Sequence, residues 1–104
     1  MRRLWPSERM AAVINKVRYR VGDATLLAHD SYWDGNNYER HGRNRFLYRS
    51  PRGRYFVVCL TMWQGERDYI EPLTDEAAYE LYEDLPEHEV PVEEAFPNVV
   101  VEPA

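Results

Sequence analysis

The sequence lacks the residues and segments that mark several common classes of protein. It has a single cysteine, Cys59, so no disulfide can form within the chain and no thiolate cluster can hold a metal. No apolar run is long enough to cross a membrane, and no signal-peptide core follows the basic N-terminus. We therefore expect a cytoplasmic protein with no membrane contact.

Recognisable catalytic machinery is also missing. The histidines lack the spacing of a helical zinc motif, the glycines do not form a phosphate-binding loop, and no glycine-flanked serine or cysteine marks a nucleophile. His29 beside Asp30 is the one pair that resembles a base with an orienting carboxylate. It is kept as an enzymatic alternative, while the sequence as a whole predicts no enzyme, no cofactor and no metal.

Large apolar side chains are plentiful, in contrast. Of the 104 residues, 44% are hydrophobic and 13% aromatic, which is enough surface to stabilise one compact core by burial. We expect a single domain over residues 1–104. It divides into a variable N-terminal segment (1–16), a core of sheet and helix (17–85) and an acidic, proline-containing tail (86–104).

Charge is distributed unevenly along the chain. Residues 1–65 contain 12 Lys and Arg against 5 Asp and Glu, a net charge of +7, whereas the rest contains 1 Arg against 13 acidic residues, a net charge of −12. The two halves either form one basic and one acidic surface or neutralise each other across the fold.

The first third of the chain predicts a short helix and then strands. Ser7 is an acceptable N-cap for a helix over residues 8–15. Apolar and basic residues then alternate over residues 17–21, which is the period of a half-buried strand. After a turn at Gly22-Asp23, the apolar run 24–28 predicts a second strand, and residues 30–44 predict a long loop of the kind that often carries function.

The clearest local signal is a β-hairpin over residues 45–63. Two apolar runs flank Ser50-Pro51-Arg52-Gly53, where Pro51 presets φ for a turn and Gly53 can adopt the left-handed conformation. Residues 64–68 predict a polar loop, and residues 69–71 a short strand that Pro72 ends.

An acidic helix is predicted next, over residues 75–85. Thr74 is a good N-cap, and the spacing of Ala77, Leu81 and Leu85 predicts that their side of the helix is buried. The tail should be extended, with 99–101 as an edge strand. The fold class is therefore α+β, a small twisted antiparallel sheet with a central β-hairpin, packed against one C-terminal helix.

Two charged surfaces compete as binding sites. The hairpin is rich in arginine among aromatic residues, a mixture that binds nucleic acid; its arginines are Arg43, Arg45, Arg49, Arg52 and Arg54. The helix carries Glu80, Glu83 and Asp84, which could occupy a basic groove on another protein. Each set could equally be solvated surface, with the arginines paired to the acidic helix.

Several short motifs resemble those of a family of small uncharacterised bacterial proteins associated with plasmids, phages and integrated elements. The motifs are Tyr-Trp-Asp-Gly (32–35), Phe-Leu-Tyr-Arg (46–49), Gly-Arg-Tyr-Phe (53–56), Trp-Gln-Gly-Glu-Arg-Asp (63–68) and Ile-Glu-Pro-Leu (70–73). The resemblance spans about residues 17–97. It implies a unit of strands, hairpin and helix, an accessory role in a mobile element and no catalytic residue.

Together these observations predict a non-enzymatic protein that binds a macromolecule, such as an anti-defence (anti-CRISPR-like) inhibitor with a protein or nucleoprotein partner. The alternative is a small nucleic-acid-binding regulator that uses the arginine-rich hairpin, and a homodimer is left open. Exposed aromatic and polar loop residues are the expected contacts: Tyr32, Trp33, Asn36, Asn37 and Tyr38 in the long loop, and Trp63, Gln64, Glu66, Arg67 and Asp68 in the next. The tryptophans could instead fold back onto the core.

Overall fold

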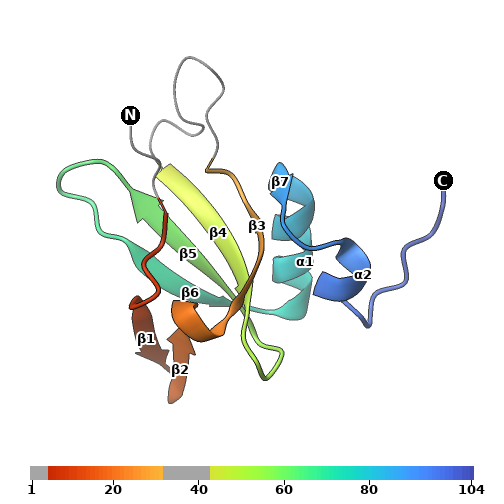
Figure 1. Ribbon diagram of the computed structural model, residues 1–104, viewed down its shortest axis with the longest axis horizontal. Coiled ribbons are helices and arrows are strands. Elements are labelled where there is room, and N and C mark those ends of the chain that lie inside the picture. Colours follow the sequence, from red (N-terminus) through yellow and green to blue (C-terminus); the bar gives the residue numbers. More distant parts are fainter. Residues whose placement is uncertain (1–4, 32–42) are drawn as a thin grey trace.

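An antiparallel five-stranded sheet forms the centre of the molecule (Figure 1). The structure, a computed structural model, describes residues 5–31 and 43–104. The strand order is β6-β5-β4-β3-β7, and a separate two-stranded sheet is made by β1 and β2. The strands of the large sheet are β3 (Thr25–His29), β4 (Arg43–Arg49), β5 (Tyr55–Thr61), β6 (Tyr69–Leu73) and β7 (Glu87–His88). The predicted α+β class is confirmed.

The central hairpin of β4 and β5 is confirmed at the predicted turn. Gly53 has a φ of 83°, its N–H donates to the Ser50 carbonyl at 2.9 Å, and the Ser50 N–H donates to the Arg54 carbonyl at 2.8 Å. Strand β4 begins at Arg43, inside the segment predicted as loop, and β5 ends at Thr61. The hairpin is therefore displaced slightly toward the N-terminus relative to the prediction.

The helix predicted over residues 8–15 is wrong. This segment holds β1 (Ala11–Ile14), which pairs with β2 (Val17–Arg20) through a two-residue turn. Asn15 and Lys16 both have positive φ, 52° and 66°, as a type I′ hairpin turn requires. Ser7 caps only one turn, through its hydroxyl and the Arg9 N–H at 3.1 Å.

A close backbone contact joins this hairpin to the segment before it. The short 3₁₀ helix η1 (Val21–Asp23) follows β2, and the Gly22 N–H donates to the Glu8 carbonyl at 3.1 Å. A Cβ on Gly22 would lie 2.8 Å from that carbonyl oxygen. Glycine is therefore required here by space.

Pro72 does not end the strand predicted over residues 69–71, which continues to Leu73 as β6. β6 lies at the edge of the sheet, where proline's missing N–H can face away from the neighbouring strand. Pro72 stands opposite Phe56 in the register with β5.

The acidic helix α1 (Asp75–Asp84) begins as predicted, with the Thr74 hydroxyl accepting from the Ala77 N–H at 3.1 Å. Its buried face is different from the prediction. Ala78, Tyr82 and the C-cap Leu85 are buried, whereas Ala77 and Leu81 are half-buried. The helix is thus turned so that Tyr82 faces the core.

The tail is more structured than predicted. After α1 it forms β7, which pairs with β3, and then the short helix α2 (Val92–Ala95). Ala95 and Phe96 are buried in the core, so the packed part of the chain extends beyond residue 85. The edge strand predicted at 99–101 is wrong, because these residues form no strand.

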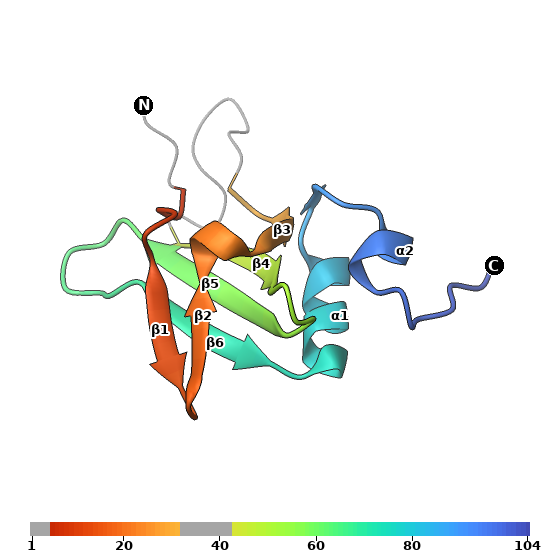
Figure 2. The ribbon, with the colours of Figure 1, turned by 60° about the horizontal axis from the view of Figure 1, so that its bottom comes forward.

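Hydrophobic clusters lie on both faces of the sheet, where the length suggested one core. Residues alternate along β4 and β5, so that Leu47 and Tyr55 join α1 and α2 on one face, while Phe46 and Phe56 lie on the other. The β1–β2 hairpin covers this second face (Figure 2). We call the two the helix face and the hairpin face.

Candidate protein-binding surfaces

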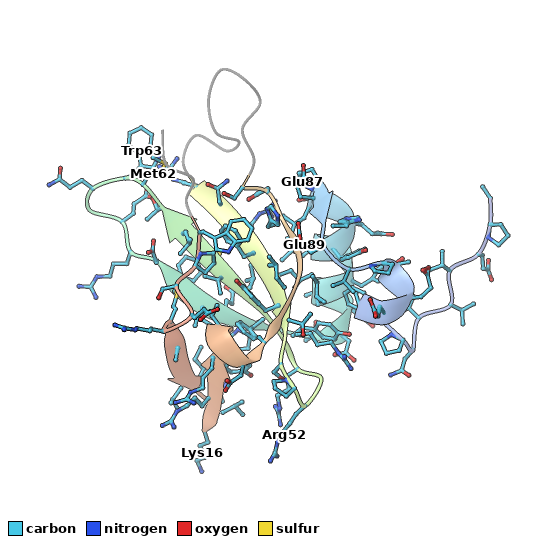
Figure 3. All side chains as sticks on the ribbon, viewed as in Figure 1. Lys16, Arg52, Met62, Trp63, Glu87 and Glu89 are labelled. Atoms are coloured by element: carbon cyan, nitrogen blue, oxygen red, sulfur yellow. The ribbon has the colours of Figure 1, made fainter. Side chains whose placement is uncertain are left out.

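The loop between β5 and β6 presents two large apolar side chains to solvent. Met62 is 50% exposed and Trp63 is 51% exposed. Both extend from one end of the sheet (Figure 3). Trp63 therefore does not fold back onto the core, which sequence alone left open.

This loop is fastened by hydrogen bonds close to the exposed side chains. The Arg43 guanidinium donates to both carboxylate oxygens of Glu66, at 2.8 Å from Nη2 and 3.1 Å from Nε. Glu66 also accepts from the Thr61 hydroxyl, and the Thr61 oxygen in turn accepts from the Trp63 N–H at 3.1 Å. Bonds from Arg43 and Thr61 hold the pKa of the Glu66 carboxyl below its ordinary value.

Further contacts tie the loop to the strand end. The Thr61 N–H donates to the Asp68 carboxylate at 2.9 Å, and the Glu66 N–H to the Trp63 carbonyl at 3.3 Å. The Arg43 guanidinium lies 5.5 Å from the centre of the Trp63 ring, within cation–π range. Gln64 and Arg67 are exposed at the tip. The predicted contact residues 63, 64 and 66–68 thus belong to one ordered loop.

The arginines of the central hairpin do not form one basic surface. Arg43, Arg45 and Arg49 project from the helix face, opposite Thr61, Cys59 and Tyr55 respectively. Arg43 pairs with Glu66, and Arg45 pairs with Asp84 at 2.9 Å and with the buried Asp30 at 3.5 Å. Arg52 and Arg54 are exposed at or beside the turn. Arg45 therefore pairs with the acidic helix, as the alternative interpretation predicted for the arginines, whereas Arg43 pairs with the β5–β6 loop.

The acidic residues of α1 behave differently along the helix. Asp84, at its C-terminal end, is bound by Arg45, while Glu80 and Glu83 lie exposed. Burial, and after it the charge and hydrogen bond of Glu83, raise the pKa of Tyr79 above its ordinary value. The outer side of the helix therefore keeps a negative surface that the arginines do not neutralise completely.

His29 and Asp30 do not form the base and orienting carboxylate that their adjacency suggested. The buried His29 ring accepts from the Ser31 N–H at Nδ1, 3.2 Å away, so Nε2 carries the proton and donates to Glu89 at 3.1 Å. Asp30 instead accepts from the Arg45 N–H at 2.7 Å. Trp5 and Phe46 enclose the imidazole, an arrangement typical of a satisfied core histidine.

The apolar neighbours of Cys59 in the sequence predict a buried, inert thiol, but in the structure Cys59 is half-buried. It lies on the helix face beyond the end of α1, in a hollow of about 150 Å³ that Arg45 and Tyr69 also line. A hydrogen bond with Cys59 is the largest of the effects that raise the pKa of Tyr69 to about 12. Sequence reasoning missed Arg45 as the cation opposite Cys59, although the strand register implies it.

A larger hollow, about 380 Å³ in volume, was not predicted. It lies between α1 and the segment after α2, with Tyr55, Tyr79 and Phe96 among its lining residues. The sequence signal for this hollow was the aromatic residue Phe96 in the acidic tail. The prolines of the tail led instead to the prediction of an extended segment. The long-loop candidates Tyr32, Trp33, Asn36, Asn37 and Tyr38 lie outside the described residues.

No protein-family model, curated protein or solved structure matches the chain. Within residues 5–31 and 43–104, no three His, Cys, Asp or Glu side chains gather where they could hold a metal ion. In the same part of the chain, no helix has the length and apolar character needed to span a membrane.

Proposed function

We propose that this chain is a non-enzymatic protein that binds another protein, with the β5–β6 loop as its contact surface. The observation that carries the proposal is Trp63, half exposed on a loop that hydrogen bonds fasten to the ends of β4 and β5. Exposed tryptophan, methionine and arginine are the side chains enriched at interfaces. A loop that is already ordered loses little conformational entropy when it binds.

The biological setting proposed for this binding is that of a mobile-element accessory factor, such as an anti-defence (anti-CRISPR-like) inhibitor. The motif resemblance supports this setting, and its Trp-Gln-Gly-Glu-Arg-Asp motif at 63–68 is the loop itself. An inhibitor of this kind needs only a binding surface and does not have to catalyse a reaction. The protein that Trp63 contacts would therefore specify the function.

Site-specific photocrosslinking in host cells tests the proposal. A photoreactive phenylalanine at position 63 should capture one discrete partner protein. The same residue at position 100 is the control, because Val100 is 85% exposed and lies far along the chain from the loop. Capture of the same proteins from both positions, or of none from position 63, would refute the loop as the contact surface.

A nucleic-acid-binding regulator remains the second candidate, favoured by the exposed Arg52 and Arg54. Lys16 and Arg52 extend from the end of the molecule opposite Trp63 (Figure 3), and Arg18 is also exposed. Because phosphate contacts dominate such binding, it should weaken steeply with salt and fall on replacing Arg52 and Arg54 by Ala. A gel shift at physiological salt that these changes abolish would favour this candidate; no shift would exclude it.

A further inference from the structure

The groove beside α1 is distinct from the Trp63 loop and lies at the other end of β5. Strand β5 begins at Tyr55, which lines the groove, and ends at Thr61, where the loop starts. The volume of about 380 Å³ falls within the range of typical ligand sites. An inference about this groove does not rest on the function proposed for the loop.

Aromatic rings lining the groove hold one another in place. Phe96 stacks on Tyr55 with 4.9 Å between ring centres, and Tyr79 meets Phe96 edge-on at 5.2 Å. The Tyr55 hydroxyl donates to the Ala95 carbonyl at 2.7 Å, which fixes the segment that carries Phe96. Tyr55 and Phe96 are buried, so they support the partly exposed Tyr79 ring as a surface for the stem or the charge of a cationic side chain.

Carboxylates also line the groove on the side of α1. Asp75, Glu76 and Glu80 all contribute to it, and all three are exposed. Asp75 and Glu76 lie in the first turn, where the helix dipole favours negative charge. Glu80 lies one turn further, four residues from Glu76, where like charges repel. Glu76 and Glu80 therefore place two carboxylates on the same side of the helix, where they face the groove.

Arg49 also lines the groove, where it offers hydrogen-bond donors and the carboxylates do not. Its Nε is buried and out of an occupant's reach, and its guanidinium also interacts with the Tyr55 side chain. Arg49 as a whole is half-buried, so other N–H groups of the guanidinium can donate to a carbonyl oxygen that an occupant brings. Three carboxylates and one arginine together match an occupant that has both a cationic group and hydrogen-bond acceptors.

We propose that this groove binds a basic segment of a partner polypeptide. A Lys or Arg side chain of the segment lies against Tyr79 with its charge toward Glu76 and Glu80, and a main-chain carbonyl accepts from Arg49. A polypeptide fits both requirements, because every residue supplies a carbonyl and basic residues supply the cation.

Peptide titration at physiological salt tests this site directly. The probe is a fluorescein-labelled Gly-Arg-Ala-Arg-Gly peptide, and its citrulline counterpart is a neutral control of nearly the same shape. The arginine peptide should bind saturably, and Glu76→Gln with Glu80→Gln should weaken it about tenfold, since two ion pairs are lost. The control is Glu93→Gln with Glu94→Gln, which removes the same charge from α2 outside the groove and should change affinity by less than about twofold.

A second pair of variants separates the contribution of the Tyr79 ring to peptide affinity from the contribution of charge. Tyr79→Ala should weaken the arginine peptide about as much as the double glutamine variant, while Tyr79→Phe should keep its affinity. Equal losses from the α2 variant, equal binding of the citrulline peptide or no saturation would overturn the proposal. Sedimentation showing a dimer that Tyr79→Ala disrupts would assign the groove to a second copy of the chain instead.

Discussion

The hairpin face and the helix face of the sheet take alternate residues from the same strands, yet they differ in chemistry. Under the β1–β2 hairpin, the residues Phe46, Tyr48, Phe56 and Val58 are all buried and make one apolar layer. On the helix face, α1 and α2 cover the part around Leu47 and Tyr55 and leave Arg43, Cys59 and Tyr69 at least partly open. Both faces therefore contain a buried core, but only the helix face leaves part of the sheet uncovered, with polar groups available for binding.

The largest effect should come from breaking the hairpin face. Phe56 is fully buried and stacks against Tyr48, so Phe56→Ala should lower the free energy of unfolding by about 3–5 kcal/mol. Tyr69→Ala, on the uncovered part of the helix face, should cost less than about 1 kcal/mol, because Tyr69 is half exposed. Urea denaturation measures both, and similar losses would show that the two faces do not differ as described.

The orientation of α1 gives the next test. Tyr82 is buried and donates to the Val90 carbonyl at 2.6 Å, so Tyr82→Ala should cost about 3 kcal/mol. Leu81 is only half-buried, so Leu81→Ala should cost about 1 kcal/mol. Thermal unfolding compares the stability of the two variants. A larger loss of stability for Leu81→Ala would mean that the face predicted from the helical spacing is the buried one.

A smaller effect is expected at high pH. Burial raises the pKa of Tyr48, on the hairpin face, from 10 to about 12. The stability it contributes is therefore fully present below pH 10 and is lost as the pH rises through about 12. The free energy of unfolding, measured from pH 9 to 12, should therefore fall less steeply with pH for Tyr48→Phe than for the natural chain. Identical slopes would mean that Tyr48 does not titrate as its burial requires.

Labelling of Cys59 tests how open the helix face is compared with the hairpin face, and it requires no destabilising substitution. Because this thiol is half-buried on the open part of the helix face, a thiol-reactive dye should label it in the folded protein, more slowly than after unfolding. Labelling followed by absorbance, with and without urea, gives both rates. Complete protection in the folded state would place Cys59 in the core after all.

Local chemistry was enough to predict the elements whose ends are marked by side chains. Pro51 and Gly53 specify the central turn, and Thr74 specifies where α1 begins. The β1–β2 hairpin was not predicted because its turn requires a positive φ at Lys16, a conformation that lysine rarely marks in a sequence. The segment around Met10 to Ile14 also has apolar residues at spacings that suit a helix.

The candidate sites were predictable only in part, because exposure and pairing depend on distant residues. Sequence identified the loop at 63–68, but it could not show that Trp63 is exposed there or that Arg43 pairs with Glu66. The groove could not be predicted, because it forms only when Phe96 returns from the tail to stack on Tyr55. The pairing of Arg45 with Asp84 likewise requires the helix to pack on the sheet.

The central claim is that Trp63 is the anchor of a protein contact and contributes little to folding. Its most direct test is calorimetric titration of the protein captured at position 63 with the natural chain and with Trp63→Ala. We predict an affinity loss of about thirtyfold or more, the effect of removing an interface hot spot, with an unfolding free energy changed by less than about 0.5 kcal/mol. Unchanged affinity, or a loss of affinity matched by a loss of stability, would contradict the account.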